Sequence, residues 1–234
     1  MNKEFEDYIQ KDGKRINKVD PKQLSDGENF QDYVQLCLKR NGINISFYKT
    51  EILQRQFGEG PSGYEIKLDR RCTGYKENDP TNQLSIEYQK YIKNSANEFF
   101  WNKSGIFNHA KLPYYVQGNP DNFWIFKITV LEELLKIKKN SSETLLNRKE
   151  YWPPSQWRNN KPIVPIDKIT LSPLRSFLLP LNYCDKFANI KFTNINDKMV
   201  MVENLDVVYN LETLKEEIKN SIKKDTQSIK ELFS

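Results

Sequence analysis

The chain has 234 residues, of which 38% are hydrophobic and 29% charged, and no apolar run approaches the length that crosses a bilayer, which excludes a membrane protein. Aromatic residues make up 12%, enough to bury a core, so the composition also excludes a wholly disordered chain. The formal net charge of +5 favours a polyanionic partner, although a composition rich in Lys and Asn also follows from an A/T-rich genome.

The histidine and cysteine content limits the possible chemistry. His109 is the only histidine, which excludes nuclease and zinc-hydrolase sites that need more than one. Cys37, Cys72 and Cys184 form no CxxC pair, and the N-terminal segment has no apolar stretch of a secretory signal. The phosphate-loop and GxSxG motifs are also missing from the sequence, and the GxGxxG match at 58–63 leads into a predicted strand instead of a helix. We therefore expect a cytoplasmic protein whose catalysis would use carboxylates, lysine and a hard metal ion.

The first elements in chain order are an arm and a helix. Residues 1–24 are charged and show no strong period, so they are predicted to be an arm. A helix follows over residues 25–41, because Ser25 or Asp26 can cap its first turn and Asn41-Gly42 ends it. Its apolar stripe consists of Phe30, Val34, Cys37 and Leu38.

Alternating apolar and polar residues predict three strands in the next part of the chain, at 43–49, 64–69 and 84–88. The glycine-rich segment 58–63 is predicted to be a turn that leads into the second strand. The segment 50–57 fits neither the helical nor the strand pattern.

A β-hairpin is predicted over 114–126, a helix over 130–138 and a long loop over 140–165. Two further strands are predicted at 177–181 and 200–202. The last element is a helix capped by Asn210, with one apolar face formed by Leu211, Leu214, Ile218 and Ile222. This order predicts an α/β (α+β) layer sandwich, a sheet flanked by helices. We expect a core over residues 25–138 and a C-terminal extension over 139–234 that packs on the core.

The segment with the clearest chemistry is Gly58-Glu59-x-x-x-Gly63-Tyr64-Glu65-Ile66-Lys67. Side chains alternate in a strand, so Glu65 and Lys67 share one face while Ile66 points into a core. We expect the turn to bring Glu59 back beside Glu65, where the two carboxylates with the Ile66 carbonyl would hold Mg²⁺, for which Mn²⁺ would substitute. Such a set suits phosphodiester hydrolysis, with Lys67 either accepting a proton or stabilising the transition state. The alternative is a solvated strand face with a surface Glu-Lys pair.

Residues 28–87 resemble the core of the PD-(D/E)XK nuclease superfamily, which includes many type II restriction endonucleases. The closer resemblance is to phage and restriction-type proteins with a pattern like G-E-x-x-x-G-x-E-I-K. Further similar segments are Ser85-Ile86-Glu87, Ser104-Gly105-Ile106, Tyr115-Val116-Gln117-Gly118-Asn119 and Ile125-Phe126. The resemblance spans roughly residues 25–135. It implies a restriction-endonuclease-like core with a mixed central sheet, in which Glu59, Glu65 and Lys67 are catalytic.

The chain departs from the family at the first acid. The superfamily usually has Asp at the turn position, often after Pro, whereas this chain has Glu59 after Gly58. Glu51 is the rival for this role. The first helix of the fold often projects an acid towards the site, and Glu28, in preference to Asp32, would serve here; helix capping and a solvated face are the alternative for both.

Several residues near the motif are secondary candidates. Glu87 shares a face with Ser85 on a strand expected to neighbour the motif strand, where it would support the site or pair with a cross-strand lysine. Asp69 would lie on the side of the site that faces the DNA phosphate, or it would have a structural role. Arg70 and Arg71 would contact the phosphate backbone of DNA or occupy a solvated turn.

Two tryptophans and two arginines lie in the loop 140–165. Trp152, Trp157, Arg148 and Arg158 would enter a DNA groove, or the two tryptophans would simply cover a core.

The resemblance implies a Mg²⁺-dependent DNA endonuclease, most closely a type II restriction enzyme that makes site-specific double-strand breaks. Two-fold symmetry of a palindromic site would then require a homodimer on double-stranded DNA. A repair or recombination nuclease of the same fold and a non-catalytic nucleic-acid-binding protein are the alternatives.

Overall fold

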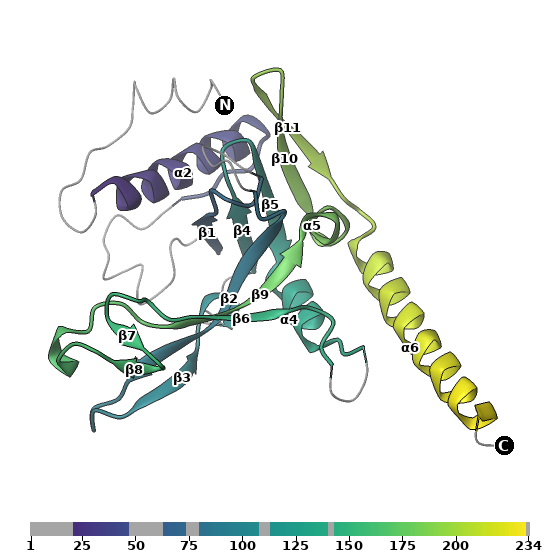
Figure 1. The fold of residues 1–234 in the computed structure, drawn as a ribbon. Helices are drawn as coiled ribbons and strands as arrows, with labels where there is room; N and C mark the ends of the chain where they lie inside the picture. The colour runs from purple at the N-terminus through teal and green to yellow at the C-terminus, as the bar shows by residue number, and fades with distance from the viewer. Residues whose placement is uncertain (1–20, 47–62, 74–79, 108–112, 140–142, 233–234) are drawn as a thin grey trace.

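The computed structural model describes residues 21–46, 63–73, 80–107, 113–139 and 143–232 (Figure 1). These residues form two main β-sheets with helices packed against them, and one of the sheets is mixed. The predicted α/β (α+β) class is therefore confirmed. In these residues, no helix is long and apolar enough to cross a membrane.

The first sheet contains the strand of the Glu-Ile-Lys motif. Its strand order is β1 (Tyr64–Leu68), β4 (Tyr114–Gly118), β5 (Asn122–Lys127), β10 (Ile190–Ile195) and β11 (Lys198–Glu203). Strands β1 and β4 are parallel, and the other neighbours are antiparallel. The hairpin predicted over 114–126 is confirmed as β4 and β5.

The second sheet is antiparallel. Its strand order is β3 (Phe99–Lys103), β2 (Gln83–Lys93), β9 (Leu174–Pro180) and β6 (Arg148–Tyr151). β7 (Trp157–Arg158) and β8 (Lys161–Pro162) form a separate two-stranded ribbon, and the 3₁₀ turns are η1 (Gly105–Phe107) and η2 (Ile166–Lys168). The segment after residue 139 therefore supplies strands to both sheets.

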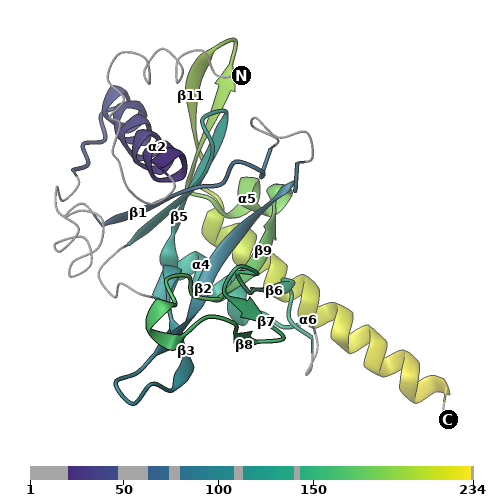
Figure 2. The same cartoon turned by 60° about the vertical axis from the view of Figure 1, so that its left-hand side comes forward.

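The two faces of the first sheet bury separate cores. On one face, helix α2 (Pro21–Arg40) packs against the sheet (Figure 2), and the predicted stripe is buried. This cluster includes Phe30, Val34, Cys37 and Leu38 with Ile66, Val116, Phe123 and Phe192. The opposite face contributes Tyr115, Trp124 and Phe126 to a larger cluster. Their partners come from β2, β9, α4 (Ile128–Lys136), α5 (Leu181–Phe187) and the start of α6 (Val207–Leu232).

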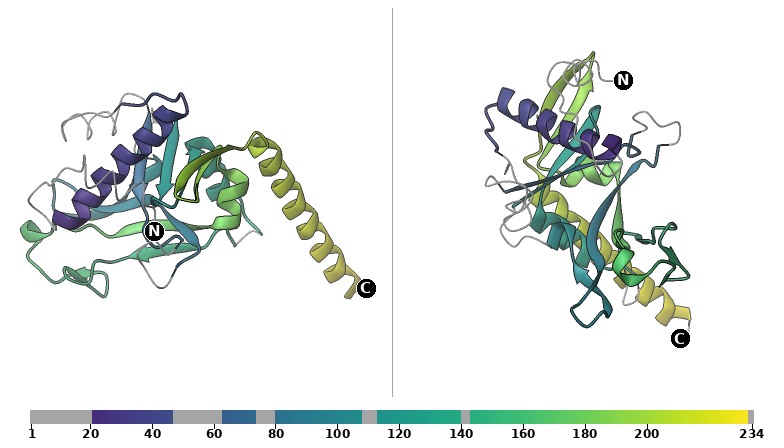
Figure 3. Two further views of the ribbon diagram at one scale, coloured as in Figure 1. Left: turned by 90° about the horizontal axis from the view of Figure 1, so that it is seen from above. Right: turned by 90° about the vertical axis from the view of Figure 1, so that its left-hand side faces the viewer.

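Helix α6 leaves the body of the molecule after its first turns (Figure 3). Val207 and Leu211 are buried, and Leu214 packs against the larger cluster. Beyond them the helix runs outward (Figure 3), so among the side chains described for α6 those of its first part contribute to the core.

Several predicted boundaries are wrong. Helix α2 begins at Pro21, so Ser25 and Asp26 lie inside the helix instead of capping it. Asn210 lies inside α6, where its amide donates to the Lys186 carbonyl over 3.0 Å. The predicted loop 140–165 contains β6, β7 and β8. Within the predicted strand 43–49, residues 43–46 form no regular strand, and the others lie outside the described residues.

Candidate active site

Glu65 and Lys67 form an ion pair on one face of β1. The Glu65 Oε1 atom lies 3.2 Å from the Lys67 Nζ atom, and the two side chains are 6% and 44% exposed. Ile66 points to the opposite face and is buried under α2. The predicted alternation is thus confirmed, and the pair is not a solvated surface pair, because its carboxylate is almost fully buried.

Asp69 and Gln117 connect the end of β1 to the second sheet. The Gln117 amide nitrogen donates to Asp69 Oδ2 over 3.0 Å and to the Ser85 carbonyl over 3.1 Å. Asp69 also accepts hydrogen bonds from the backbone N–H groups of Arg71 and Ser85. Burial raises the pKa of Asp69, and these hydrogen bonds oppose the shift. Of the two roles predicted for Asp69, these contacts fit the structural one.

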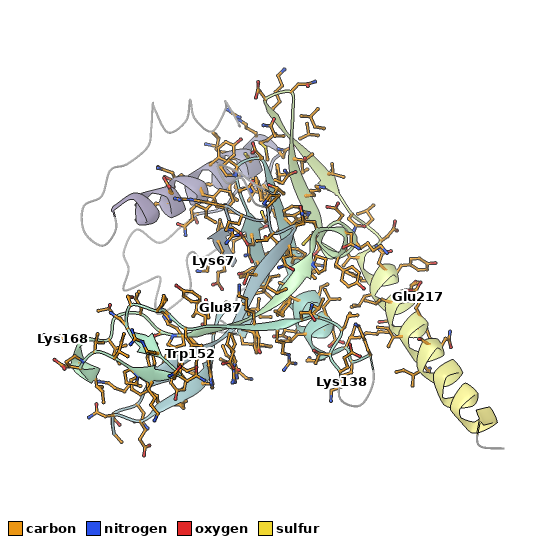
Figure 4. All side chains as sticks on the ribbon, in the orientation of Figure 1. Lys67, Glu87, Lys138, Trp152, Lys168 and Glu217 are labelled. Carbon is orange, nitrogen blue, oxygen red and sulfur yellow. The ribbon has the colours of Figure 1, made fainter. Side chains whose placement is uncertain are left out.

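A hollow of about 310 Å³ opens above this group, between the two sheets. Its walls are formed by Lys67, Leu68, Ser85, Glu87, Tyr115, Gln117, Lys149, Tyr151, Leu174 and Ser176. Lys67 comes from the first sheet, whereas Glu87 and Lys149 come from the second. Figure 4 shows Lys67 and Glu87 in the middle of the molecule, above the arm that carries β6. Two lysines and one glutamate therefore face the hollow, which offers cationic groups to a phosphate without being uniformly positive.

Glu87 lines the hollow, but its strand is not hydrogen-bonded to β1. Strand β2 belongs to the second sheet, and the parallel neighbour of β1 is β4. The predicted adjacency of the two strands is therefore wrong. The Glu87 carboxylate accepts a hydrogen bond from the Ser104 hydroxyl, and its cross-strand neighbour is Ser176. Among the described residues, the position opposite Glu87 on β9 is thus held by a serine and not by a lysine.

Other predicted residues lie apart from this group or outside the described residues. Glu59 and Glu51 are both outside them. Glu28 lies on α2, which covers the opposite face of the sheet from Glu65. Arg70 is ion-paired with Asp26 of α2, while the neighbouring Arg71 is exposed.

The two tryptophans of the 140–165 segment belong to an aromatic cluster. Trp152 and Trp157 pack against each other and against the ring of Tyr91, and Trp157 is 3% exposed. Trp157 is thus buried as the core-covering alternative expects, whereas Trp152 is only partly buried. Arg148 lies with its guanidinium 5.7 Å from the centre of the Tyr88 ring, and Arg158 is exposed on the small ribbon.

Two oxygen atoms of this site are buried without a hydrogen-bond partner among the described residues: Glu65 Oε2 and Gln117 Oε1. Buried polar atoms are nearly always hydrogen-bonded, so each exception requires an explanation. Within the described residues, however, no group of three or more His, Cys, Asp and Glu side chains is placed to hold a metal ion. A metal site built on Glu65 would need an oxygen from another residue type or from 47–62.

The buried cysteines offer no alternative nucleophile. Burial raises the pKa of the Cys37 and Cys72 thiols to about 12, and that of Cys184 well above its usual value. A thiol is nucleophilic only as the thiolate, which these residues do not form near neutral pH.

Sequence reasoning assigned no role to Gln117 and Lys149, although both line the hollow. Gln117 was detectable as a polar residue in an otherwise apolar strand, Tyr-Tyr-Val-Gln-Gly. Lys149 gave no signal, since β6 has only exposed residues. No family model, no curated protein and no solved structure matches the chain.

Proposed function

We propose that the protein is a Mg²⁺-dependent DNA endonuclease of the PD-(D/E)XK type. The observation that carries this proposal is the pair of Glu65 and Lys67. The acid is buried on the face of β1 that borders the hollow, and the lysine beside it lines that hollow. A buried carboxylate is costly unless a cation or hydrogen-bond donors compensate it; Lys67 pairs with Glu65 Oε1, whereas Glu65 Oε2 has no hydrogen-bond partner among the described residues.

The donor set fits a hard divalent cation. Carboxylate and carbonyl oxygens are the ligands that Mg²⁺ prefers, and Glu65 with the Ile66 carbonyl would provide two of them. Glu59, or its rival Glu51, would add the second acid. Mg²⁺, for which Mn²⁺ should substitute, would supply charge neutralisation at the phosphoryl oxygens and a more acidic water molecule.

The residues of the chain itself would bind and orient the phosphate. The Lys67 ammonium is held by Glu65 and borders the hollow, so it can donate to a phosphoryl oxygen as negative charge develops there. Lys149 would hold the same phosphate group or its neighbour from the opposite wall. The net charge of +5 supports a polyanionic substrate. We propose that this substrate is double-stranded DNA.

Incubation of plasmid DNA with the purified protein and Mg²⁺ tests this function. We expect cleavage that EDTA abolishes and that Lys67→Ala reduces by about 100-fold or more, the loss typical of removing a transition-state donor. Lys168→Ala is the matched control, because this lysine is exposed in the 3₁₀ turn η2. Retention of DNA without cleavage in Mg²⁺ or Mn²⁺ would instead support a binding protein, and failure to bind DNA would exclude both functions.

The same assay separates the remaining alternatives. Loss of cleavage in Glu59→Ala but not in Glu51→Ala would identify the second acid. A type II enzyme acting as a homodimer should convert supercoiled plasmid directly to linear DNA with defined ends. A repair nuclease should prefer structured or nicked substrates and yield no defined ends.

A further inference from the structure

We infer that Gln117 provides a side-chain oxygen ligand to the same divalent cation that Glu65 binds. The inference rests on the proposed function, because it assumes that a cation occupies the Glu65 face of β1. It adds to that site a neutral ligand on the neighbouring strand β4.

The orientation of the Gln117 amide is determined by its partners. Its nitrogen contacts two acceptors, the Asp69 carboxylate at 3.0 Å and the Ser85 carbonyl at 3.1 Å. Exchanging the amide oxygen and nitrogen would place an oxygen against both acceptors, which is repulsive. The Oε1 atom must therefore point away from them, where it has no hydrogen-bond partner within the described residues.

The two unpartnered oxygens belong to adjacent strands and to one face of the sheet. Glu65 pairs in register with Tyr115, and Lys67 pairs with Gln117. Gln117 is thus a diagonal neighbour of Glu65, at a separation that long side chains can bridge. Both residues are almost fully buried, at 5% exposure for Glu65 and 4% for Gln117.

A cation is the partner that best satisfies both atoms. Each oxygen is a buried acceptor without a hydrogen-bond partner among the described residues, and leaving a buried polar group unpaired is costly. The Lys67 ammonium lies against the other carboxylate oxygen, Oε1. A carboxylate and an amide oxygen together are hard ligands of the kind that divalent cations bind.

The test measures cation binding directly, without DNA. Calorimetric titration with MnCl₂ should show Gln117→Met weakening Mn²⁺ binding by about 10-fold or more, because the ligand oxygen is removed. Gln117→Glu, made together with Asp69→Asn, keeps an oxygen in place of Oε1, and the amide introduced at position 69 donates to the carboxylate introduced at position 117, so that the repulsion between two carboxylates is avoided. The Mn²⁺ affinity of this double variant should equal or exceed that of the wild type. Gln89→Met, which removes a partly buried amide bound to Arg175 on the second sheet, should leave the affinity unchanged.

The two Gln117 variants separate a ligand from a structural donor. If both lose Mn²⁺ affinity, Gln117 acts only through its hydrogen bonds and the inference is wrong. If Gln117→Met binds Mn²⁺ as tightly as the wild type, a buried water satisfies Oε1 and the inference is equally wrong. In both cases the proposed function survives if the wild type binds Mn²⁺ and cleaves DNA. A wild type that neither binds Mn²⁺ nor cleaves DNA would overturn the proposed function itself.

Discussion

The two oxygens of the buried Glu65 carboxylate have different interaction partners. One faces the Lys67 ammonium at 3.2 Å, and the other has no hydrogen-bond partner in the described part of the chain. Because Lys67 is 44% exposed, water screens the ion pair, and its contribution to stability is small. In the metal-free protein the site is therefore expected to reduce stability, as functional sites often do.

This imbalance predicts the behaviour of Glu65→Gln. In EDTA its melting temperature should be at least that of the wild type, because a neutral amide is cheaper to bury than a carboxylate. Mg²⁺ should stabilise the wild type, by about 2.7 kcal/mol at a hundredfold excess over Kd, but not the variant. Thermal unfolding with and without Mg²⁺ measures both effects.

The control for Glu65→Gln is a variant that removes a carboxylate from another part of the protein. Glu150→Gln, on β6, removes an acid that pairs with Arg175 and should keep the full Mg²⁺ stabilisation. Equal stabilisation of Glu65→Gln and the wild type would show that Glu65 is not a ligand.

At the scale of elements, the β4–β5 hairpin is held by its turn. Asn119 is fully buried, and its side-chain oxygen accepts the N–H groups of Asp121 and Asn122 at 3.0 and 3.1 Å. Its amide nitrogen donates to the Thr73 hydroxyl over 2.8 Å. The turn thus also fixes the segment just after Asp69. The Asp69 carboxylate accepts the hydrogen bond that orients the Gln117 amide.

Asn119→Ala should therefore destabilise the protein by about 3 kcal/mol, because several buried groups lose their partners at once. Asn102→Ala is the control, since this asparagine is exposed and bonds only to the next N–H in the chain among the contacts recorded for it; its cost should stay within about 0.5 kcal/mol. Denaturant unfolding in EDTA gives both values. A similar cost for both variants would contradict the role of the turn.

The elements that the sequence predicts correctly are those with a local pattern. The stripe on α2, the alternation of β1 and the turn residues of the hairpin are all written in neighbouring residues. Strand β6 is invisible because its four residues, Arg-Lys-Glu-Tyr, are all exposed. The start of α2 was misplaced because Ser25 and Asp26 are common capping residues that here lie within the helix.

The candidate site was predictable only in part. The shared face of Glu65 and Lys67 follows from the period of a strand, and the structure confirms it. The parallel pairing of β1 with β4 does not follow from local pattern, because it joins segments across a long crossover. The role of Gln117 depends on that pairing and on Asp69 and Ser85, which are 48 and 32 residues away in sequence.

At the scale of the whole molecule, helix α6 divides into an anchored and a projecting part. Val207 and Leu211 are buried, and Lys215 lies 3.3 Å from Glu133 of α4. Farther out, Ile218 and Ile222 line an open hollow of about 470 Å³ against the end of α4. Five lysines line this hollow, at positions 136, 138, 215, 219 and 223. Glu133 is the acidic residue that lines it. Three of these lysines are ion-paired, Lys136 and Lys215 with Glu133 and Lys219 with Glu216.

Truncation after Lys223 tests this division. Because the buried apolar contacts described for α6 lie at or before Leu214, the truncated chain should melt within about 2 °C of the full chain. Leu211→Ala should instead cost about 2–5 kcal/mol, or several degrees of melting temperature. If truncation lowers the melting temperature as far as Leu211→Ala, the distal turns belong to the fold. If the truncated protein keeps its melting temperature and its linear plasmid products, the projecting part is needed neither for folding nor for cutting both strands.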